Sequence, residues 1–413
     1  MNQILYSLIG YLLLPFMLLR LIIKNLKTPV HKQRIGERLG FINAIQGNTI
    51  WVHCVSVGEF MAAISLIDAL IASYPTHKIL ITSTTKTGSN AIIEHYQNRV
   101  LHYYFPFDVD FIIRRYVKKV APKICLLLET EIWPNLISEL HKNGIPTLLI
   151  SARLSQKSLA KYQKMPTFSR QILNKLTLIA AQNQKSAERF KKLGTADDKI
   201  IITGNIKFDQ NPKLNSAVSK QLKNIVCKRK VVVFASTHKG EERAIIDAYS
   251  KNPVAAILLI IPRHPERFDE VFKLAQKRNF SISKRSENQP CIDCKILLGD
   301  SMGEMMDYFA IADIVFMGGS LSNTGGHNML EPAALAKPIL FGENVFNFSE
   351  ISADLLAQNA AIQVQNADDL LIKASMLLND REKAKTLGNN AKKHLQSKQG
   401  ALNNTLQKIQ LFC

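Results

Sequence analysis

The sequence is sparing in cysteine and lacks several common signatures. Its 413 residues hold only six cysteines, too few for a disulfide scaffold of this length, and they favour a reducing compartment. Cys291 and Cys294 form a lone CxxC without the two further ligands that a zinc site needs, so we expect two surface thiols. The chain also lacks internal repeats, a GxGxxG loop and a GxxxxGK[ST] loop. These absences disfavour NAD-dependent and kinase functions.

Acidic residues are scarce in two long stretches. None occurs between residues 140 and 187 or between 210 and 240, and the whole chain has 53 Lys+Arg against 33 Asp+Glu, a net charge of +20. This surplus indicates an anionic partner: nucleic acid, anionic lipid or a phosphorylated substrate. No RNP-type motif or zinc-finger spacing supports nucleic acid. The eight Lys and Arg residues between 140 and 187 form either a membrane-facing surface or a solvated face.

One long apolar run opens the chain. Residues 4–23 read ILYSLIGYLLLPFMLLRLII, which is about the length that crosses a bilayer, and only Arg20 is charged. Basic residues follow the run, at Lys24, Lys27, Lys32, Arg34 and Arg38. A secretory signal peptide would carry its charge before the run, so we expect an anchor over 1–27 with the remainder cytoplasmic. Spanning the membrane, lying in its interface and packing as a buried helix all stay open.

Short apolar runs alternate with helical patterns through the rest of the chain, as parallel strands covered on both faces should. The runs lie at 50–57, 79–82, 124–128, 147–150, 178–181 and 200–203, then at 231–235, 256–261, 295–298, 314–317 and 339–341. We expect helices at 241–248, 303–312 and 328–336. The pattern predicts two doubly wound, Rossmann-like α/β domains over 28–209 and 229–413, joined by a polar, basic linker over 210–228. Two such domains facing a cleft form the GT-B architecture, and they also suit other two-domain α/β enzymes.

Charged side chains follow several strands of the first domain. Glu59, in SVGE, opens a helix whose N-terminus favours the ionised carboxylate, which is either a base for a substrate hydroxyl or a helix-capping acid. Glu129 and Glu131, in ETEIWPN, either bind a hydroxyl, orient a cation, or are solvated loop acids. Lys207, in GNIKFD, either stabilises charge on a leaving phosphate or is a surface lysine.

The second domain has two segments suited to anions. Arg263, held between prolines in PRHPER, can grip a phosphate or carboxylate in bidentate fashion. The glycines of 318–326 let the backbone approach a ligand, and a helix from Asn328 directs its amide groups at an anion. Glu331 can accept hydrogen bonds from a ribose diol, although a helix cap with a packed Glu is the plainer alternative. Together the two segments favour nucleotide binding.

These segments resemble the Kdo (3-deoxy-D-manno-octulosonic acid) transferase family. The resemblance rests on SVGE, ETEIWPN, SARLS, GNIKFD, PRHPERF, GDSMGEM and GGHNMLEP in this order, and covers most of the chain. It implies an inverting GT-B enzyme without metal or cofactor, in which Glu59 is the general base and Glu129 and Lys207 assist the transition state. It also implies that CMP is held by Pro262, Arg263, Gly303, Glu304, Met305, Asn328, Met329, Leu330 and Glu331.

The same resemblance implies the partners and the location. The donor is CMP-Kdo, bound by the second domain, and the acceptor is a lipid A precursor, bound by the first. Apart from the resemblance, we expect that a helix at the C-terminus can pack back on the first domain. The enzyme then works at the anionic cytoplasmic surface of the inner membrane and binds no nucleic acid. A UDP-sugar-dependent GT-B transferase of cell-envelope synthesis is the alternative, which competition between CMP and UDP separates.

Overall fold

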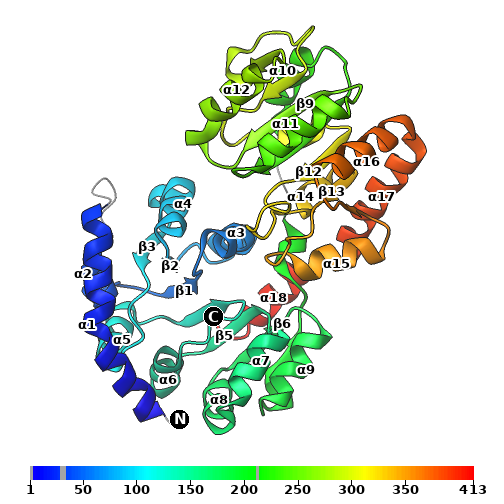
Figure 1. Cartoon of the computed structure of the whole chain (residues 1–413). Coiled ribbons are helices and arrows are strands. Elements are labelled where there is room, and N and C mark those ends of the chain that lie inside the picture. Colours follow the sequence, from blue (N-terminus) through cyan, green and yellow to red (C-terminus); the bar gives the residue numbers. More distant parts are fainter. Residues whose placement is uncertain (1–2, 28–33, 211–213) are drawn as a thin grey trace. The chain divides into compact units, whose positions relative to one another are not determined.

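The chain divides into two compact units, each built on a parallel β-sheet (Figure 1). The computed structural model describes residues 3–27, 34–210 and 214–413. Unit 1 takes the chain up to residue 210 together with 398–413, and unit 2 takes 211–397. The predicted class of two Rossmann-like α/β domains with one apolar N-terminal helix is confirmed.

Unit 1 has a seven-stranded sheet within the described residues, in the order β3-β2-β1-β4-β5-β6-β7. Because β1 pairs with both β2 and β4, the strand order reverses between β1 and β4, and this is the point where doubly wound sheets bind ligands. The strands are β1 (Thr49–His53), β2 (Lys78–Ser83), β3 (Leu101–Tyr104), β4 (Ile124–Leu128), β5 (Thr147–Ala152), β6 (Leu178–Ala181) and β7 (Ile200–Ile202).

Helices surround this sheet, and their apolar faces cover it on both sides in two buried clusters. The α-helices of unit 1 are α1 (Gln3–Lys27), α2 (Ile35–Arg38), α3 (Val57–Ser73), α4 (Lys86–Tyr96), α5 (Asp110–Val120), α6 (Pro134–Lys142), α7 (Gln156–Gln163), α8 (Pro166–Leu173), α9 (Gln184–Lys192) and α18 (Ala401–Ile409). The 3-10 helices are η2 (Gln97–Arg99), η3 (Asp197–Lys199) and η4 (Ile206–Asp209).

Unit 2 repeats the design with the order β10-β11-β9-β8-β12-β13-β14, so its switch point lies between β8 and β12. The strands are β8 (Val231–Thr237), β9 (Ile257–Pro262), β10 (Ile282–Lys284), β11 (Ile296–Leu298), β12 (Ile314–Met317), β13 (Ile339–Phe341) and β14 (Ile362–Gln363). The helices are α10 (Ser216–Ile225), α11 (Glu241–Lys251), η5 (Pro265–Arg267), α12 (Phe268–Lys277), η6 (Arg285–Glu287), α13 (Met305–Ile311), α14 (Leu330–Ala334), α15 (Ser349–Ala357), α16 (Ala367–Asn379) and α17 (Arg381–Ser397).

Several predicted elements need correction. The run 50–57 is a strand only to His53, because the following residues turn into α3. The region 210–228 is not a plain linker, since α10 lies within it and belongs to unit 2; residues 211–213, like Lys32, fall outside the described residues. The helix expected from Asn328 begins at Leu330 and is short. Strands β3, β10 and β14 were missed because they are polar, aromatic or very short.

The C-terminal helix α18 packs on unit 1. Ala401 and Ile409 join the apolar cluster beneath α3. The carboxylate of Asp209 accepts hydrogen bonds from the backbone N–H groups of Gly400 (2.6 Å) and Leu402 (3.0 Å), which belong to the start of this helix. The last residues therefore close the unit that begins the chain.

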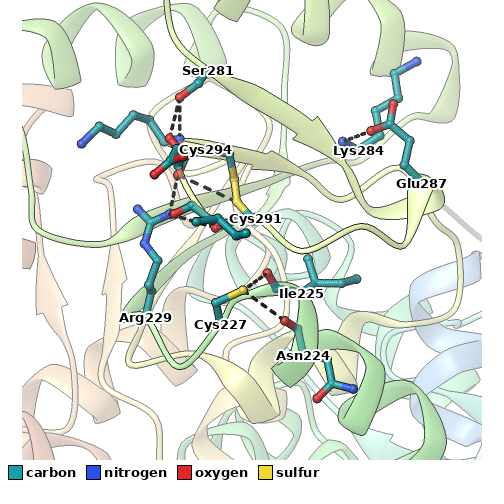
Figure 2. The surroundings of a disulfide bond; sticks show 12 residues. Asn224, Ile225, Cys227, Arg229, Ser281, Lys284, Glu287, Cys291 and Cys294 are labelled. Carbon is teal, nitrogen blue, oxygen red and sulfur yellow. Dashed lines mark hydrogen bonds between the residues drawn. A yellow bond between two sulfur atoms is a disulfide. The ribbon is translucent and has the colours of Figure 1, made fainter.

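The CxxC pair is the clearest departure from expectation. Cys291 and Cys294 are buried and joined by a disulfide, so the prediction of two surface thiols is wrong (Figure 2). The Nη1 of Arg229 donates to the carbonyl oxygens of Cys291, Ile292 and Cys294 at 3.1, 3.1 and 2.7 Å, as Figure 2 shows in part. This guanidinium organises the loop that the disulfide closes.

Candidate active site

Glu59 stands at the switch point of unit 1, in the first turn of α3. The hydroxyl of Ser56 caps the helix by accepting from the N–H of Glu59 at 3.4 Å. The Glu59 carboxylate turns back and accepts from the N–H of Val55 at 2.6 Å. The capping role that the sequence left open is therefore present, and it fixes one carboxylate oxygen at the carboxyl end of β1.

Glu129 and Lys207 form an ion pair at the same edge of the sheet. Glu129 follows β4 directly and has a φ of +52°, a left-handed conformation that non-glycine residues rarely adopt. Its Oε1 lies 2.6 Å from the Nζ of Lys207, and the two side chains are only 17 % and 20 % exposed. Of the roles considered for Glu129, orienting a cation is the one that this geometry displays.

Three carboxylates share this edge, and two of them, Glu59 and Glu131, have raised pKa values. Burial raises the pKa of Glu59 to about 8, with further contributions from the charges of Glu131 and Glu129. The N–H of Val55 and the charge of Lys207 act in the opposite direction but do not cancel these effects. The ionised form, which the helix N-terminus favours, is therefore the minor form of Glu59 at neutral pH. Burial likewise raises the pKa of Glu131 to about 7, although Trp133 donates to it at 2.9 Å.

Lys207 is positioned by residues for which the sequence predicted no role. The side-chain oxygen of Asn205 accepts from the Lys207 N–H at 3.0 Å, and its Nδ2 donates to Gln182 at 3.3 Å. Gln182 in turn donates to the carbonyl oxygen of Ser151 at 2.8 Å, and Ser151 has a φ of +49°. Ser151 lies in the SARLS segment, so the sequence did carry a signal for this position, but the network itself needs the fold.

The carboxyl end of the unit 2 sheet carries the second set of predicted residues. Pro262 is the last residue of β9 and is buried, whereas Arg263 is exposed and its N–H donates to the Thr237 carbonyl oxygen at 2.9 Å. Gly318 follows β12, and a Cβ there would lie 2.6 Å from the carbonyl oxygen of Ser236. The loop can approach the neighbouring strand only because this residue is glycine.

Glu241 holds that glycine-rich loop and was not predicted. Its buried carboxylate accepts from the N–H groups of Gly319 (2.7 Å), Leu321 (2.9 Å) and His238 (2.8 Å). His238 also places its Nε2 2.8 Å from the Nε2 of His327, with the two rings nearly parallel. Because burial lowers the pKa of His327 to about 3, this imidazole is neutral at physiological pH.

Of the other residues predicted to bind the nucleotide, some have polar side chains and some have side chains buried in the core. Asn328 donates to the Oε1 of Glu331 at 3.1 Å, and the charge of Arg263 partly offsets the rise that burial causes in the pKa of Glu331. These three residues therefore act on one another. The side chains of Met329 and Leu330 are buried in the core, so only their backbone groups remain to contact a ligand.

The segment from Gly303 to Met305 is held by an arginine that was not predicted from the sequence. Arg285 makes two contacts of 3.1 Å with the carboxylate of Glu304, and Ser301 donates to the same carboxylate at 2.5 Å. Gly303 is exposed with a φ of +80°, and Met305 begins α13. The Glu304 side chain is therefore engaged within the protein. Within the described ranges, no group of three His, Cys, Asp or Glu residues is placed to hold a metal ion.

Comparison with known proteins places the chain in a family. Residues 33–210 match the model of the 3-deoxy-D-manno-octulosonic-acid transferases, and residues 184–394 match that of the group 1 glycosyl transferases. A glycosyltransferase structure from Rickettsia africae superposes with a TM-score of 0.58 at 15% identity, covering 89% of this chain and 98% of its own, which shows the fold alone. The C-terminal CMP-Kdo binding domain of WaaA from Acinetobacter baumannii is 35% identical, with a TM-score of 0.42, over 44% of this chain and all of its own.

Two relatives match most of the chain. The 3-deoxy-D-manno-octulosonic acid transferase of Haemophilus influenzae is 38% identical over 403 residues, which is 94% of this chain and 93% of that protein. The Rickettsia felis enzyme of the same description is 34% identical over 88% of this chain and 79% of its own. Since the similarity runs through both units, the chain belongs to the Kdo transferase family of glycosyltransferases.

Proposed function

We propose that this Kdo transferase moves Kdo from CMP-Kdo to a lipid A precursor, a phosphorylated and acylated glucosamine disaccharide. The transfer inverts the anomeric centre and uses no metal ion or cofactor. The observation that carries the proposal is the group formed by Glu59, Glu129, Glu131 and Lys207 at the switch point of unit 1. A carboxylate with a raised pKa beside a lysine–carboxylate pair is typical of an acid–base site.

The raised pKa of Glu59 supports its role as the general base. A carboxylate whose pKa lies near the working pH takes up and releases a proton readily, and burial brings Glu59 to about 8. In its ionised form it removes the proton of the acceptor hydroxyl. The oxygen then bonds to the anomeric carbon of Kdo as the bond to the CMP phosphate breaks, and the electron pair leaves with the phosphate. One displacement of this kind inverts the carbon.

Glu129 and Lys207 together stabilise the charge that develops during the transfer. The 2.6 Å contact holds the ammonium group of Lys207 in place before substrate arrives, so little reorganisation is needed at the moment of reaction. The same ammonium lowers the pKa of Glu59 and keeps its ionised form accessible. Lys207 thus stabilises the transition state, and Glu129 orients the ammonium group of Lys207.

Unit 2 supplies the donor site in this proposal. Arg263 binds the phosphate, while Pro262 and the backbone of 303–305 and 328–330 contact the nucleotide. Glu331, already held by Asn328, accepts from the ribose hydroxyls. The exposed guanidinium of Arg263 and the close-lying glycine loop support this assignment.

The proposed acceptor is a membrane lipid, so the enzyme must work at the membrane. An acidic, acylated disaccharide lies in a membrane and carries the charge that a chain of net charge +20 attracts. The one helix in the described residues that is long and apolar enough to cross a membrane covers 3–23, with a mean hydropathy of 1.9. We place the enzyme at the inner membrane by this single anchor, with both units on the cytoplasmic side.

The test is transfer to a tetra-acylated lipid A precursor, followed by mass spectrometry. We expect one or more Kdo increments from CMP-Kdo, unchanged by EDTA, and inhibition by CMP but not by UDP at equal concentration. The configuration of the new linkage, determined by NMR, should be inverted relative to the donor. Use of a UDP-sugar with inhibition by UDP would instead favour the UDP-dependent transferase.

A further inference from the structure

The N-terminal end of α1 makes specific polar contacts with unit 1. Tyr6 donates to the carboxylate of Asp108 at 2.9 Å, and Ser7 donates to the side-chain oxygen of Asn135 at 2.9 Å. The ammonium of Lys175 donates to Gln3 at 2.8 Å. Three contacts from the first five described residues tie this end of the helix to the unit.

Asp108, the partner of Tyr6, is a buried carboxylate that accepts several hydrogen bonds. Its side chain is almost fully buried, and it also accepts from the N–H groups of Asn135 (3.1 Å) and Leu136 (2.9 Å) at the start of α6. A buried carboxylate needs its hydrogen bonds, so the hydroxyl of Tyr6 completes a site that exists within the folded unit. The contact is therefore part of the architecture of unit 1.

Apolar contacts extend the attachment along the helix. Tyr6 lies against Phe168, and Tyr11 stacks on Phe111 with ring centroids 5.6 Å apart. At Gly10, a Cβ would lie 3.5 Å from Val109, so the helix backbone runs close to the unit. Partly covered positions recur at helical spacing, at 3, 6, 7, 10, 14, 18 and 21. Figure 1 shows α1 passing beside α5 and α6.

Crossing a bilayer would break these contacts. A helix rises 1.5 Å per residue, so residues 4–23 span about 30 Å, the thickness of the hydrocarbon core. Since unit 1 follows the C-terminal end of α1, a spanning helix would place Tyr6 and Ser7 at the opposite membrane surface. There they could not reach Asp108 and Asn135.

The outward face of α1 carries large apolar side chains. Its most exposed large side chains fall on one side of the helix, at Ile4, Leu8, Leu12, Phe16, Leu19 and Leu26. Arg115 on α5 lies over the rings of the exposed Phe41 and of Phe111, on which Tyr11 of α1 stacks, whereas the nearby Arg114 is paired with Asp110 at 2.7 Å. An apolar helix face with the Arg115 cation near it fits the surface of a leaflet that contains anionic lipids.

We propose that α1 lies in the plane of the membrane surface, docked on unit 1 through Tyr6 and Ser7, and does not cross the bilayer. Its apolar face enters the cytoplasmic leaflet, and both of its ends stay on the cytoplasmic side. This inference rests on the proposed membrane association and specifies its geometry. The helix thereby fixes the orientation of unit 1 toward the lipid.

The first experiment tests the membrane topology of the whole chain without substitutions, carrying an epitope tag at its N-terminus. Sedimentation with membranes is measured first, and its failure would overturn the membrane association and this inference together. We then expect protease added to intact spheroplasts to leave the tag untouched and to remove it only after lysis. Removal of the tag from intact spheroplasts would show that α1 spans the bilayer, while the membrane association would stand.

The second experiment tests docking in isolated membranes. Tyr11→Cys and Phe111→Cys are combined in a chain whose exposed Cys227 and Cys413 are replaced by serine. A short bifunctional thiol reagent should give about tenfold more cross-linked chain than the control pair, in which the outward-facing Leu12→Cys replaces Tyr11→Cys. Equal yields from the two pairs would overturn the docked helix.

Discussion

The raised pKa of Glu59 makes the pH dependence of transfer predictable. With a pKa of about 8, the fraction of Glu59 that is ionised is about one hundredth at pH 6 and about one tenth at pH 7. Since only the ionised form accepts the proton, kcat/KM should rise about tenfold between these values and level off above pH 8. Initial rates with CMP-Kdo from pH 5.5 to 9.5 measure this profile.

Replacing one neighbour tests the cause of the shift. Glu131→Gln keeps an oxygen that accepts from Trp133 but removes the charge that, after burial, raises the pKa of Glu59 most. We expect the midpoint to fall by about one pH unit and kcat/KM at pH 7 to rise about fivefold, with an unchanged plateau. Glu94→Gln, an exposed acid on α4, is the control and should leave the profile in place. A profile of Glu131→Gln that superposes on the wild type would show that the charge of Glu131 does not raise the pKa of Glu59.

Three further predictions concern stability and donor binding. Because the folded pKa of Glu59 lies above its ordinary 4.5, ionisation of this group disfavours the fold, and the free energy of unfolding should fall as pH rises from about 4.5 through about 8. Glu59→Gln should therefore raise the free energy of unfolding at pH 8 by about 1–2 kcal/mol, measured by urea titration. Arg285→Ala removes two of the contacts that hold Glu304, leaving that of Ser301, and should raise the KM for CMP-Kdo with little change in kcat, as steady-state kinetics will show. Asp209→Ala leaves two N–H groups at the start of α18 without their acceptor and should lower the free energy of unfolding of unit 1 by about 1–2 kcal/mol, again by urea titration.

The sequence was informative wherever a property is local. Parallel strands covered on both faces appear as apolar runs, and the charged segments that follow them lie at the carboxyl edges of the two sheets, as expected for Glu59, Glu129 and Arg263. Strand β3 escaped because LHYY is aromatic and partly exposed, so it has no apolar run. Its presence follows only from pairing with β2.

The interactions that tune the site depend on distant residues. At Glu59 the helix N-terminus contributes about 0.3–1 kcal/mol toward ionisation, and burial with two neighbouring carboxylates outweighs it. Glu241 ties the glycine loop from 78 residues away, and Tyr6 reaches Asp108 across 102 residues. No spacing rule relates such pairs, because the fold alone brings them together.

The most direct test of the central claim is Kdo transfer by Glu59→Gln beside the wild type and the Glu94→Gln control. At pH 8, with CMP-Kdo and the tetra-acylated lipid A precursor, we expect a loss of about 10²–10⁴-fold in kcat for Glu59→Gln and wild-type activity for the control. CMP binding by the variant, measured by calorimetry, should be unchanged. Transfer at the wild-type rate by a folded Glu59→Gln protein would contradict the role of this carboxylate as the base.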